Sequence, residues 1–189
     1  MKKFLPWLIF ILFSLLATMA MLSEIDRLPT ASIAEASPRQ QQIRIILVGD
    51  VMLNRGVEHM VEKEGSGNFK FPFWKIADYL NKADLVFGNL ESPISDKGEK
   101  VGSIYSFRAE PEAIDGLTYA GFDVLSLANN HAFDYGWEAL KDTLERLNEA
   151  GINSVGIDSP VIKEIKNTKI AFLAYTNSGL PSWGIGWAD

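Results

Sequence analysis

The sequence predicts an α/β domain with a mostly parallel sheet and helices on both faces, because strand-like and helix-like patterns alternate along residues 43–176. A second observation is that three successive strand patterns end in polar side chains. The carboxyl ends of parallel strands share one edge of a sheet, and ligands bind beyond that edge. The alternation therefore predicts the fold, and the shared polar edge predicts the place of a site.

Short apolar runs mark the strands. Residues 43–48 are rich in β-branched side chains and are followed by Gly49 and Asp50, as expected for a buried strand. Two further runs repeat this pattern, at residues 85–87 and 124–127, and residues 152–157 are also interpreted as a strand. Residues 161–176 predict two strands joined as a hairpin around Asn167 and Thr168.

Three helical patterns fill the intervals, at residues 73–83, 110–121 and 136–151. The first places four side chains near one face, namely Trp74, Ala77, Tyr79 and Leu80. In the second, Pro111 suits a helix start and Gly121 a helix end. In the third, Trp137, Leu140, Leu144 and Leu147 are spaced at three and four residues, and Gly151 suits the end.

Composition excludes several classes of function. The net charge is 18 − 24 = −6, which argues against nucleic acid as a partner because phosphate binding needs a basic face. The absence of cysteine excludes disulfides, thiolate catalysis and thiolate metal sites. His59 and His131 are the only histidines, so a metal site in this chain depends on carboxylates and amides.

The N-terminus predicts a membrane signal. Lys2 and Lys3 precede an uncharged apolar run, and residues 1–23 are long enough for an uncleaved anchor. The alternative is a signal peptide cleaved after "AEA" at 34–36, which would give a secreted protein. The lysines favour a cytoplasmic N-terminus, so a single-pass anchor leaves the domain outside the cell membrane. Residues 24–42 are interpreted as a linker, and residues 43–189 as the domain.

The polar residues at the three strand ends are Asp50, then Asn89 and Glu91, then Asn129, Asn130 and His131. Carboxylate and amide oxygens with one imidazole suit Mn²⁺, Mg²⁺, Zn²⁺ or Fe rather than a soft metal. Such a site activates water for attack on phosphorus, with a histidine as metal ligand or proton donor. Asp134 is placed to fix the tautomer of His131.

Each of these residues also has a structural interpretation. Asp50 and Asp134 are candidate helix caps, and the asparagines are candidate turn formers. Glu91 is alternatively a solvated charge, and His59 is interpreted as a surface or core histidine. Arg55 binds an anion or is simply solvated. A functional site is excluded only if the structural interpretation is correct for every one of these residues at all three strand ends.

Five segments in order resemble the CapA capsule-synthesis family, the poly-γ-glutamate capsule biosynthesis domain. They are "GDVMLNRGV" (49–57), "GNLESPIS" (88–95), "YSFRAEPE" (105–112), "SLANNHAFDYGWEAL" (126–140) and "AGINSVGI" (150–157). The resemblance implies the layered fold of calcineurin-like metallophosphoesterases. It also implies that the metal ligands are Asp50, Glu91 and Asn130 and that His131 is catalytic. From their positions in the sequence we add Asp134 as the catalytic partner of His131, and we predict that Arg55, Asn89 and Asn129 bind substrate.

Two departures from the pattern qualify this resemblance. The first phosphoesterase motif has a histidine two residues after its aspartate, where this chain has Met52. Family members also run on to later histidine motifs that are not found in these 189 residues. We therefore expect a C-terminally incomplete domain with an exposed sheet edge, weak metal binding and little catalysis.

Three functions follow as hypotheses. The first is a membrane-anchored protein of capsule or poly-γ-glutamate biosynthesis and export, with a divalent metal and the capsule synthase subunits as partners. The second is a non-catalytic accessory subunit that binds an anionic polymer or the synthase complex. The third is a metal-dependent phosphoesterase, which Met52 disfavours.

Overall fold

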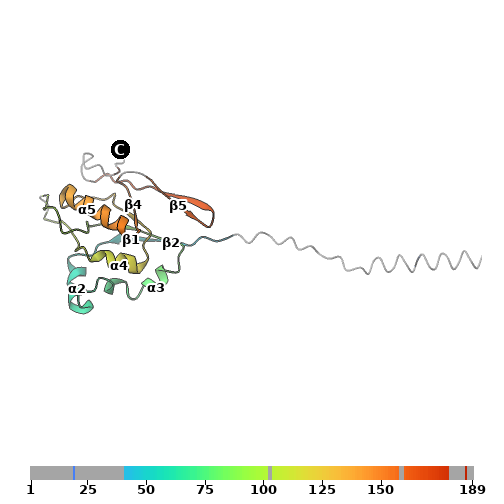
Figure 1. The fold of residues 1–189 in the computed structure, drawn as a ribbon, viewed down its shortest axis with the longest axis horizontal. Coiled ribbons are helices and arrows are strands. Elements are labelled where there is room, and N and C mark those ends of the chain that lie inside the picture. Colours follow the sequence, from blue (N-terminus) through green and yellow to red (C-terminus); the bar gives the residue numbers. More distant parts are fainter. Residues whose placement is uncertain (1–18, 20–40, 102–103, 158–159, 179–185, 187–189) are drawn as a thin grey trace, which may run out of the picture. The chain divides into compact units, whose positions relative to one another are not determined.

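Four parallel strands form the central sheet in the order β1-β2-β3-β4. Figure 1 labels three of them, β1, β2 and β4. They are β1 Ile45–Val51, β2 Leu85–Leu90, β3 Val124–Ser126 and β4 Asn153–Val155. This computed structural model describes residues 19, 41–101, 104–157, 160–178 and 186. The parallel pairing of all three neighbouring strand pairs confirms the predicted α/β class.

The helices are α2 Gly56–Gly65, α3 Ala77–Leu80, α4 Ala113–Ala120 and α5 Gly136–Glu149, with a 3₁₀ turn η1 Phe71–Phe73. The patterns at 110–121 and 136–151 correspond to α4 and α5. Gly121 ends α4 in the left-handed conformation at φ 77°, as its position predicts. Helix α2 was not predicted, because charged residues occupy much of it and only Val61 and Gly65 are buried.

The pattern at 73–83 forms only one helical turn, so its predicted apolar face is wrong in part. Ala77 and Leu80 are buried, but Trp74 is 50% and Tyr79 63% exposed. The preceding 3₁₀ turn contains Pro72 and has a tighter period than an α-helix. The α-helical spacing assumed for the whole segment therefore does not hold across residue 74.

The two faces of the sheet pack differently. One face contributes Val86 and Leu125 to a core that contains buried side chains from every helix, among them Val61, Leu117 and Leu140. On the other face, Leu85, Val124 and Val155 form a smaller cluster with residues of a hairpin. The sequence predicts helices on this second face as well, but in the structure the face is packed against the hairpin.

That hairpin joins β5 Val161–Ile165 to β6 Thr168–Phe172. Its turn residues, Lys166 and Asn167, have φ angles of 50° and 62°, which matches the twist of tight hairpins. The predicted hairpin is confirmed, with its turn one residue earlier than expected. The ring of Phe172 stacks on Phe87 of β2 at 5.7 Å, which fixes the hairpin against the sheet.

Strand β1 lies at an edge of the sheet. Among the described residues, β1 pairs only with β2. The Arg44 carbonyl accepts a hydrogen bond from Leu85 on β2, so alternation turns the backbone groups of Ile45 and Leu47 away from β2. Leu47 is 69% exposed. Within the described residues, β1 is therefore a free edge of the sheet.

The predicted anchor and most of the predicted linker lie outside the described residues, apart from Met19 and residues 41–42. No helix within the described part of the chain has the length and apolar character needed to cross a membrane.

Candidate functional site at the strand ends

Side chains from the first three strand ends are joined by direct hydrogen bonds. Asp50 pairs in register with Asn89, and the Asn89 amide donates to Asp50 Oδ1 at 2.7 Å. The Asn129 amide in turn donates to Asn89 Oδ1 at 3.0 Å and to the Leu90 carbonyl at 2.9 Å. The predicted convergence therefore takes the form of a chain of contacts across β1, β2 and the end of β3.

Asn129 also shapes the turn that carries the histidine. Its Oδ1 accepts the backbone N–H of His131 at 3.0 Å, which is an Asx-turn. The residue is only 8% exposed, and both ends of its amide are engaged within the protein. The turn-forming interpretation of Asn129 is therefore realised, in addition to its place at the site.

His131 is held by Asp134. The imidazole Nδ1 lies 2.8 Å from Asp134 Oδ2, and both side chains are largely buried, at 15% and 7% exposed. The same carboxylate oxygen accepts the backbone N–H of Phe107 at 2.7 Å. Helix α5 has Tyr135 as its N-cap with no side-chain cap bond, so the capping interpretation of Asp134 is wrong. Asp134 instead orients His131 through Nδ1, so Nε2 is the ring nitrogen that has no partner among the described residues.

Phe107 is a site residue that the sequence analysis missed. Its ring stacks on His131 with 4.0 Å between centroids, and the Arg55 guanidinium lies 5.2 Å from the same ring. Arg55, far from its partners in sequence, thus joins the site through this ring. The only signal for Phe107 is its place within "YSFRAEPE", a segment interpreted as connecting chain.

Glu91 and Asn130 lie at the site without side-chain partners among the described residues. Glu91 is half-buried, and its backbone N–H donates to the Val51 carbonyl at 3.0 Å. Asn130 is exposed between the buried Asn129 and the half-buried His131. Asp50 Oδ2 likewise has no partner, so three oxygen-bearing side chains at the strand ends remain available to a ligand.

The donor atoms of Asp50, Glu91 and Asn130 are of the chemical type that binds a hard divalent cation. They are carboxylate and amide oxygens, the ligands such ions prefer. Two buried side-chain oxygens in the same segments of sequence also lack protein partners among the described residues, namely Asn54 Oδ1 and Ser92 Oγ. However, no group of three or more His, Asp or Glu side chains within the described ranges is arranged to hold a metal.

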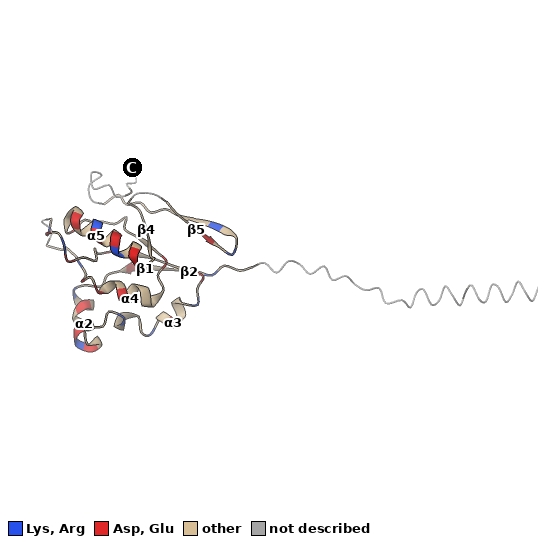
Figure 2. Ribbon diagram, viewed as in Figure 1, with Lys and Arg blue, Asp and Glu red and all other residues tan. Residues whose placement is uncertain are grey.

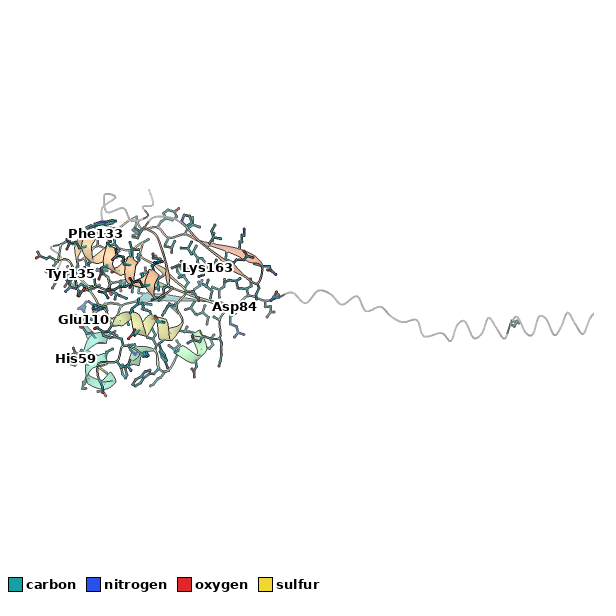
Figure 3. All side chains as sticks on the ribbon, viewed as in Figure 1. His59, Asp84, Glu110, Phe133, Tyr135 and Lys163 are labelled. Atoms are coloured by element: carbon teal, nitrogen blue, oxygen red, sulfur yellow. The ribbon has the colours of Figure 1, made fainter. Side chains whose placement is uncertain are left out.

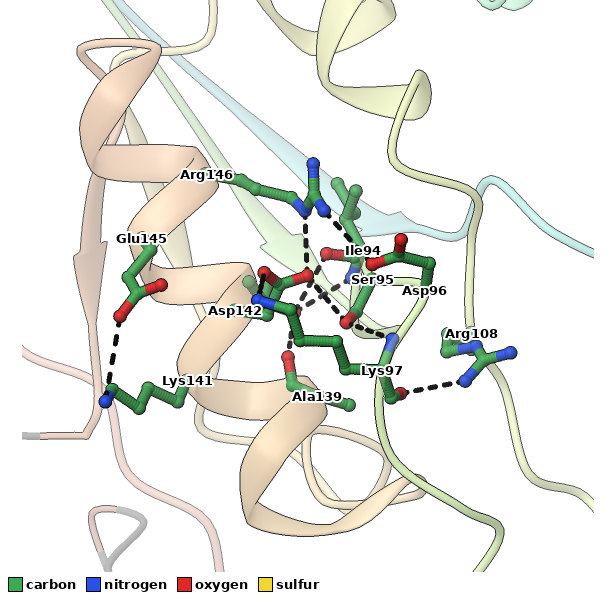
Figure 4. Close-up of polar contacts among 11 residues, drawn as sticks. Ile94, Ser95, Asp96, Lys97, Arg108, Ala139, Lys141, Asp142, Glu145 and Arg146 are labelled. Carbon is green, nitrogen blue, oxygen red and sulfur yellow. Dashed lines mark hydrogen bonds and ion pairs between the residues drawn. The ribbon is translucent and has the colours of Figure 1, made fainter.

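The segment after Glu91 is tied to α5 by a buried polar cluster around Asp142 (Figure 4). The Asp142 carboxylate accepts hydrogen bonds from Ser95, Lys97 and Arg146 at 2.7, 2.6 and 2.8 Å. Burial opposes its ionisation, but these three donors outweigh burial and lower the pKa of Asp142 to about 2. The cluster thus fixes the chain that leaves β2 at the site.

His59 does not belong to the site. It is exposed on α2, as labelled in Figure 3, which confirms the surface interpretation. Figure 2 shows acidic positions on both α2 and α5. Glu58 on α2 is partly desolvated and lies near Glu110 and Glu62, which raises its pKa. Arg55 is therefore a cation next to an acidic helix.

Comparison with known proteins gives a consistent result. The model of a bacterial capsule synthesis protein family, PGA_cap, matches residues 44–186. Capsule biosynthesis protein CapA of Bacillus anthracis is 30% identical over 161 residues, covering 79% of this chain and 38% of the relative. PGA biosynthesis protein CapA of Bacillus subtilis is 32% identical over 111 residues, covering 58% of this chain and 28% of the relative.

A probable polyglutamine synthesis accessory protein of Mycobacterium tuberculosis is 27% identical over 183 residues, covering 75% of this chain and 48% of the relative. The chain therefore spans less than half the length of each of these three relatives.

Proposed function

The chain belongs to the bacterial capsule synthesis protein family, and on that premise we propose that its strand-end site serves the biosynthesis or export of an anionic capsule polymer of the poly-γ-glutamate type. Two Bacillus relatives carry capsule or PGA biosynthesis in their names, which supports this polymer class. The observation that carries the proposal is the hydrogen-bonded chain from Asp50 through Asn89 to Asn129. It assembles motif residues from three strands at one place.

We further propose that this site takes a divalent metal. Asp50, Glu91 and Asn130 would hold it, because each has an oxygen without a protein partner in the described part of the chain. A divalent cation there supplies a Lewis acid for an anionic oxygen of the substrate. Asn89 would act indirectly, since its amide holds Asp50 in a fixed orientation.

His131 would act as the proton donor or acceptor of the site. The contact from Nδ1 to Asp134 fixes the ring and favours a proton on Nδ1, so Nε2 is the nitrogen that exchanges a proton with a ligand. Stacking on Phe107 limits rotation of the ring. The contacts with Asp134 and Phe107 therefore fix the position of the imidazole.

We also propose an extracytoplasmic location, with residues 1–23 as a single-pass anchor and the capsule synthase as partner. Lys2 and Lys3 before the apolar run support this orientation. Membrane fractionation tests the proposal: the intact chain is expected in the membrane pellet, and deletion of residues 1–23 should release it. Release of the intact chain by salt alone would contradict an anchor.

A non-catalytic accessory role is the second candidate. It is favoured by two observations. Within the described residues no group of three or more His, Asp or Glu side chains could hold a metal ion, and one relative is named as an accessory protein. In that case polymer binding would persist after the metal is removed with EDTA.

Calorimetric titration of Mn²⁺ into the chain tests the metal site. We expect saturable binding that weakens at least about tenfold in Asp50→Ala and in Glu91→Ala. Asp96→Asn is the control, because this exposed carboxylate pairs with Arg146 of α5 and is not among the proposed metal ligands. Equal Mn²⁺ binding by the wild type and all three variants would contradict the assignment of Asp50 and Glu91 as metal ligands.

A further inference from the structure

Arg55 occupies a backbone conformation that normally requires glycine. Its φ and ψ are 55° and −121°, and the Val57 N–H donates to the Asn54 carbonyl across it at 3.2 Å. These values describe the first central position of a type II′ turn, where glycine dominates because a side chain there is strained. The following residue is Gly56, so moving the glycine by one position would have relieved the strain.

The other non-glycine residues with positive φ have local explanations. Ser66 ends α2 in the left-handed conformation, and Lys166 and Asn167 form the turn of the hairpin. Only Arg55 begins a helix in this way among the described residues. Strain of this kind persists where the side chain has a function that outweighs it.

The Arg55 guanidinium is positioned but has no acidic partner. It lies 5.2 Å from the Phe107 ring, and no described carboxylate forms a salt bridge with it. Arg108 provides a contrast, because it lies over Tyr135 at 4.2 Å and donates to the Lys97 carbonyl at 2.8 Å. The donors of Arg55 remain available at an exposed position.

Phe107 connects Arg55 to the site. The same ring stacks on His131 at 4.0 Å, and the backbone N–H of Phe107 donates to Asp134. The guanidinium and the imidazole are therefore held against one ring at the end of the sheet. The Arg55 Cζ and the centroid of the imidazole are therefore at most about 9 Å apart.

We propose that Arg55 is the residue that recognises the substrate, by binding a carboxylate of a γ-glutamyl chain and placing that chain beside His131. This inference rests on the proposed function for the class of polymer. A guanidinium matches a carboxylate with two parallel hydrogen bonds, and an aromatic face holds its plane in place. The strained turn is retained because glycine at position 55 would remove the recognition group.

Binding of a fluorescent γ-linked glutamate oligomer, measured by anisotropy, tests this role. Arg55→Gln should weaken binding about ten- to hundredfold, as expected for loss of hydrogen bonds between charged groups. Arg55→Lys should weaken it less. Arg44→Gln is the matched control, because it removes one exposed positive charge at the other end of β1 and should leave affinity unchanged.

Arg55→Gly separates recognition from a structural role. Glycine relieves the turn, so the thermal midpoint should rise or stay constant while oligomer affinity falls as in Arg55→Gln. A fall of the midpoint in Arg55→Gly would mean that the arginine serves the fold, and would overturn the inference. A second experiment compares two competitors of the fluorescent oligomer: inorganic phosphate and unlabelled glutamate oligomer. Displacement by phosphate at a lower concentration than by unlabelled oligomer would overturn the assignment of a carboxylate as the ligand of Arg55.

Oligomer binding that is equal in wild type and Arg55→Gln overturns the role of Arg55 and leaves the proposed function intact. No oligomer binding by the wild-type chain, with Mn²⁺ present, overturns both the polymer class and the role of Arg55.

Discussion

Asp142→Asn tests whether a buried carboxylate on α5 holds the chain that leaves the site. Asp142 is 6% exposed in its side chain and accepts hydrogen bonds from Ser95, Lys97 and Arg146. Ser95 and Lys97 follow closely after Glu91, so the cluster joins α5 to the strand end. Asparagine keeps the shape of the side chain but removes its charge.

The expected magnitude follows from the pKa of Asp142. Its value falls from 3.8 to about 2 on folding, because three donors outweigh the effect of burial. One pKa unit corresponds to about 1.4 kcal/mol, so ionised Asp142 stabilises the fold by about 2 kcal/mol at pH 7. Because the folded pKa lies below the unfolded value, this stabilisation is present above about pH 4 and is lost as pH falls through 2. At pH 3 about 1 kcal/mol remains.

Urea denaturation of both proteins between pH 7 and pH 3 measures the difference. We expect Asp142→Asn to lower the free energy of unfolding by about 2 kcal/mol at pH 7 and by about half as much at pH 3. Asp96→Asn is the control, since its 63% exposed side chain pairs only at the surface and should change stability by less than about 1 kcal/mol. A difference that stays constant with pH would refute this reasoning.

Three further substitutions have expected outcomes. Thr143→Val removes the hydroxyl that accepts the buried N–H of Ile94 at 3.0 Å, and should cost about 1–3 kcal/mol of unfolding free energy in urea. Asn129→Ala breaks the link between strand ends and should cost a similar amount; a loss below about 0.5 kcal/mol would show that the link is dispensable. Leu47→Lys places a charge on the free edge of β1 and should reduce concentration-dependent light scattering, whereas unchanged scattering would mean that this edge does not mediate association.

The meeting of Asp50, Asn89 and Asn129 could be predicted from sequence because parallel strands place their carboxyl ends at one edge of the sheet. Periodicity likewise located α4, α5 and the hairpin. What the sequence did not contain was the pairing among the polar groups. Asn89 was assigned to substrate, but its amide is engaged with Asp50 and Asn129. Such pairings depend on register and rotamer, which composition and spacing do not encode.

Phe107 and Arg55 show a second limit of sequence reasoning. Phe107 lies in a loop without periodicity, and its place depends on the parallel bridge between Ile94 and Ala109 that brings this loop to the strand end. The significance of Arg55 lies in its backbone angles, which no residue pattern reveals. Asp142 was similarly hidden, because a charge within an amphipathic helix normally faces solvent.

Anomalous X-ray diffraction from crystals grown with Mn²⁺ tests the central claim, that the strand ends form a metal site, most directly. The account predicts an anomalous peak within coordination distance of the Asp50 and Glu91 carboxylates, and loss of that peak in Asp50→Ala crystals. A peak at another carboxylate such as Asp142, or the absence of any peak at the strand ends, would contradict it.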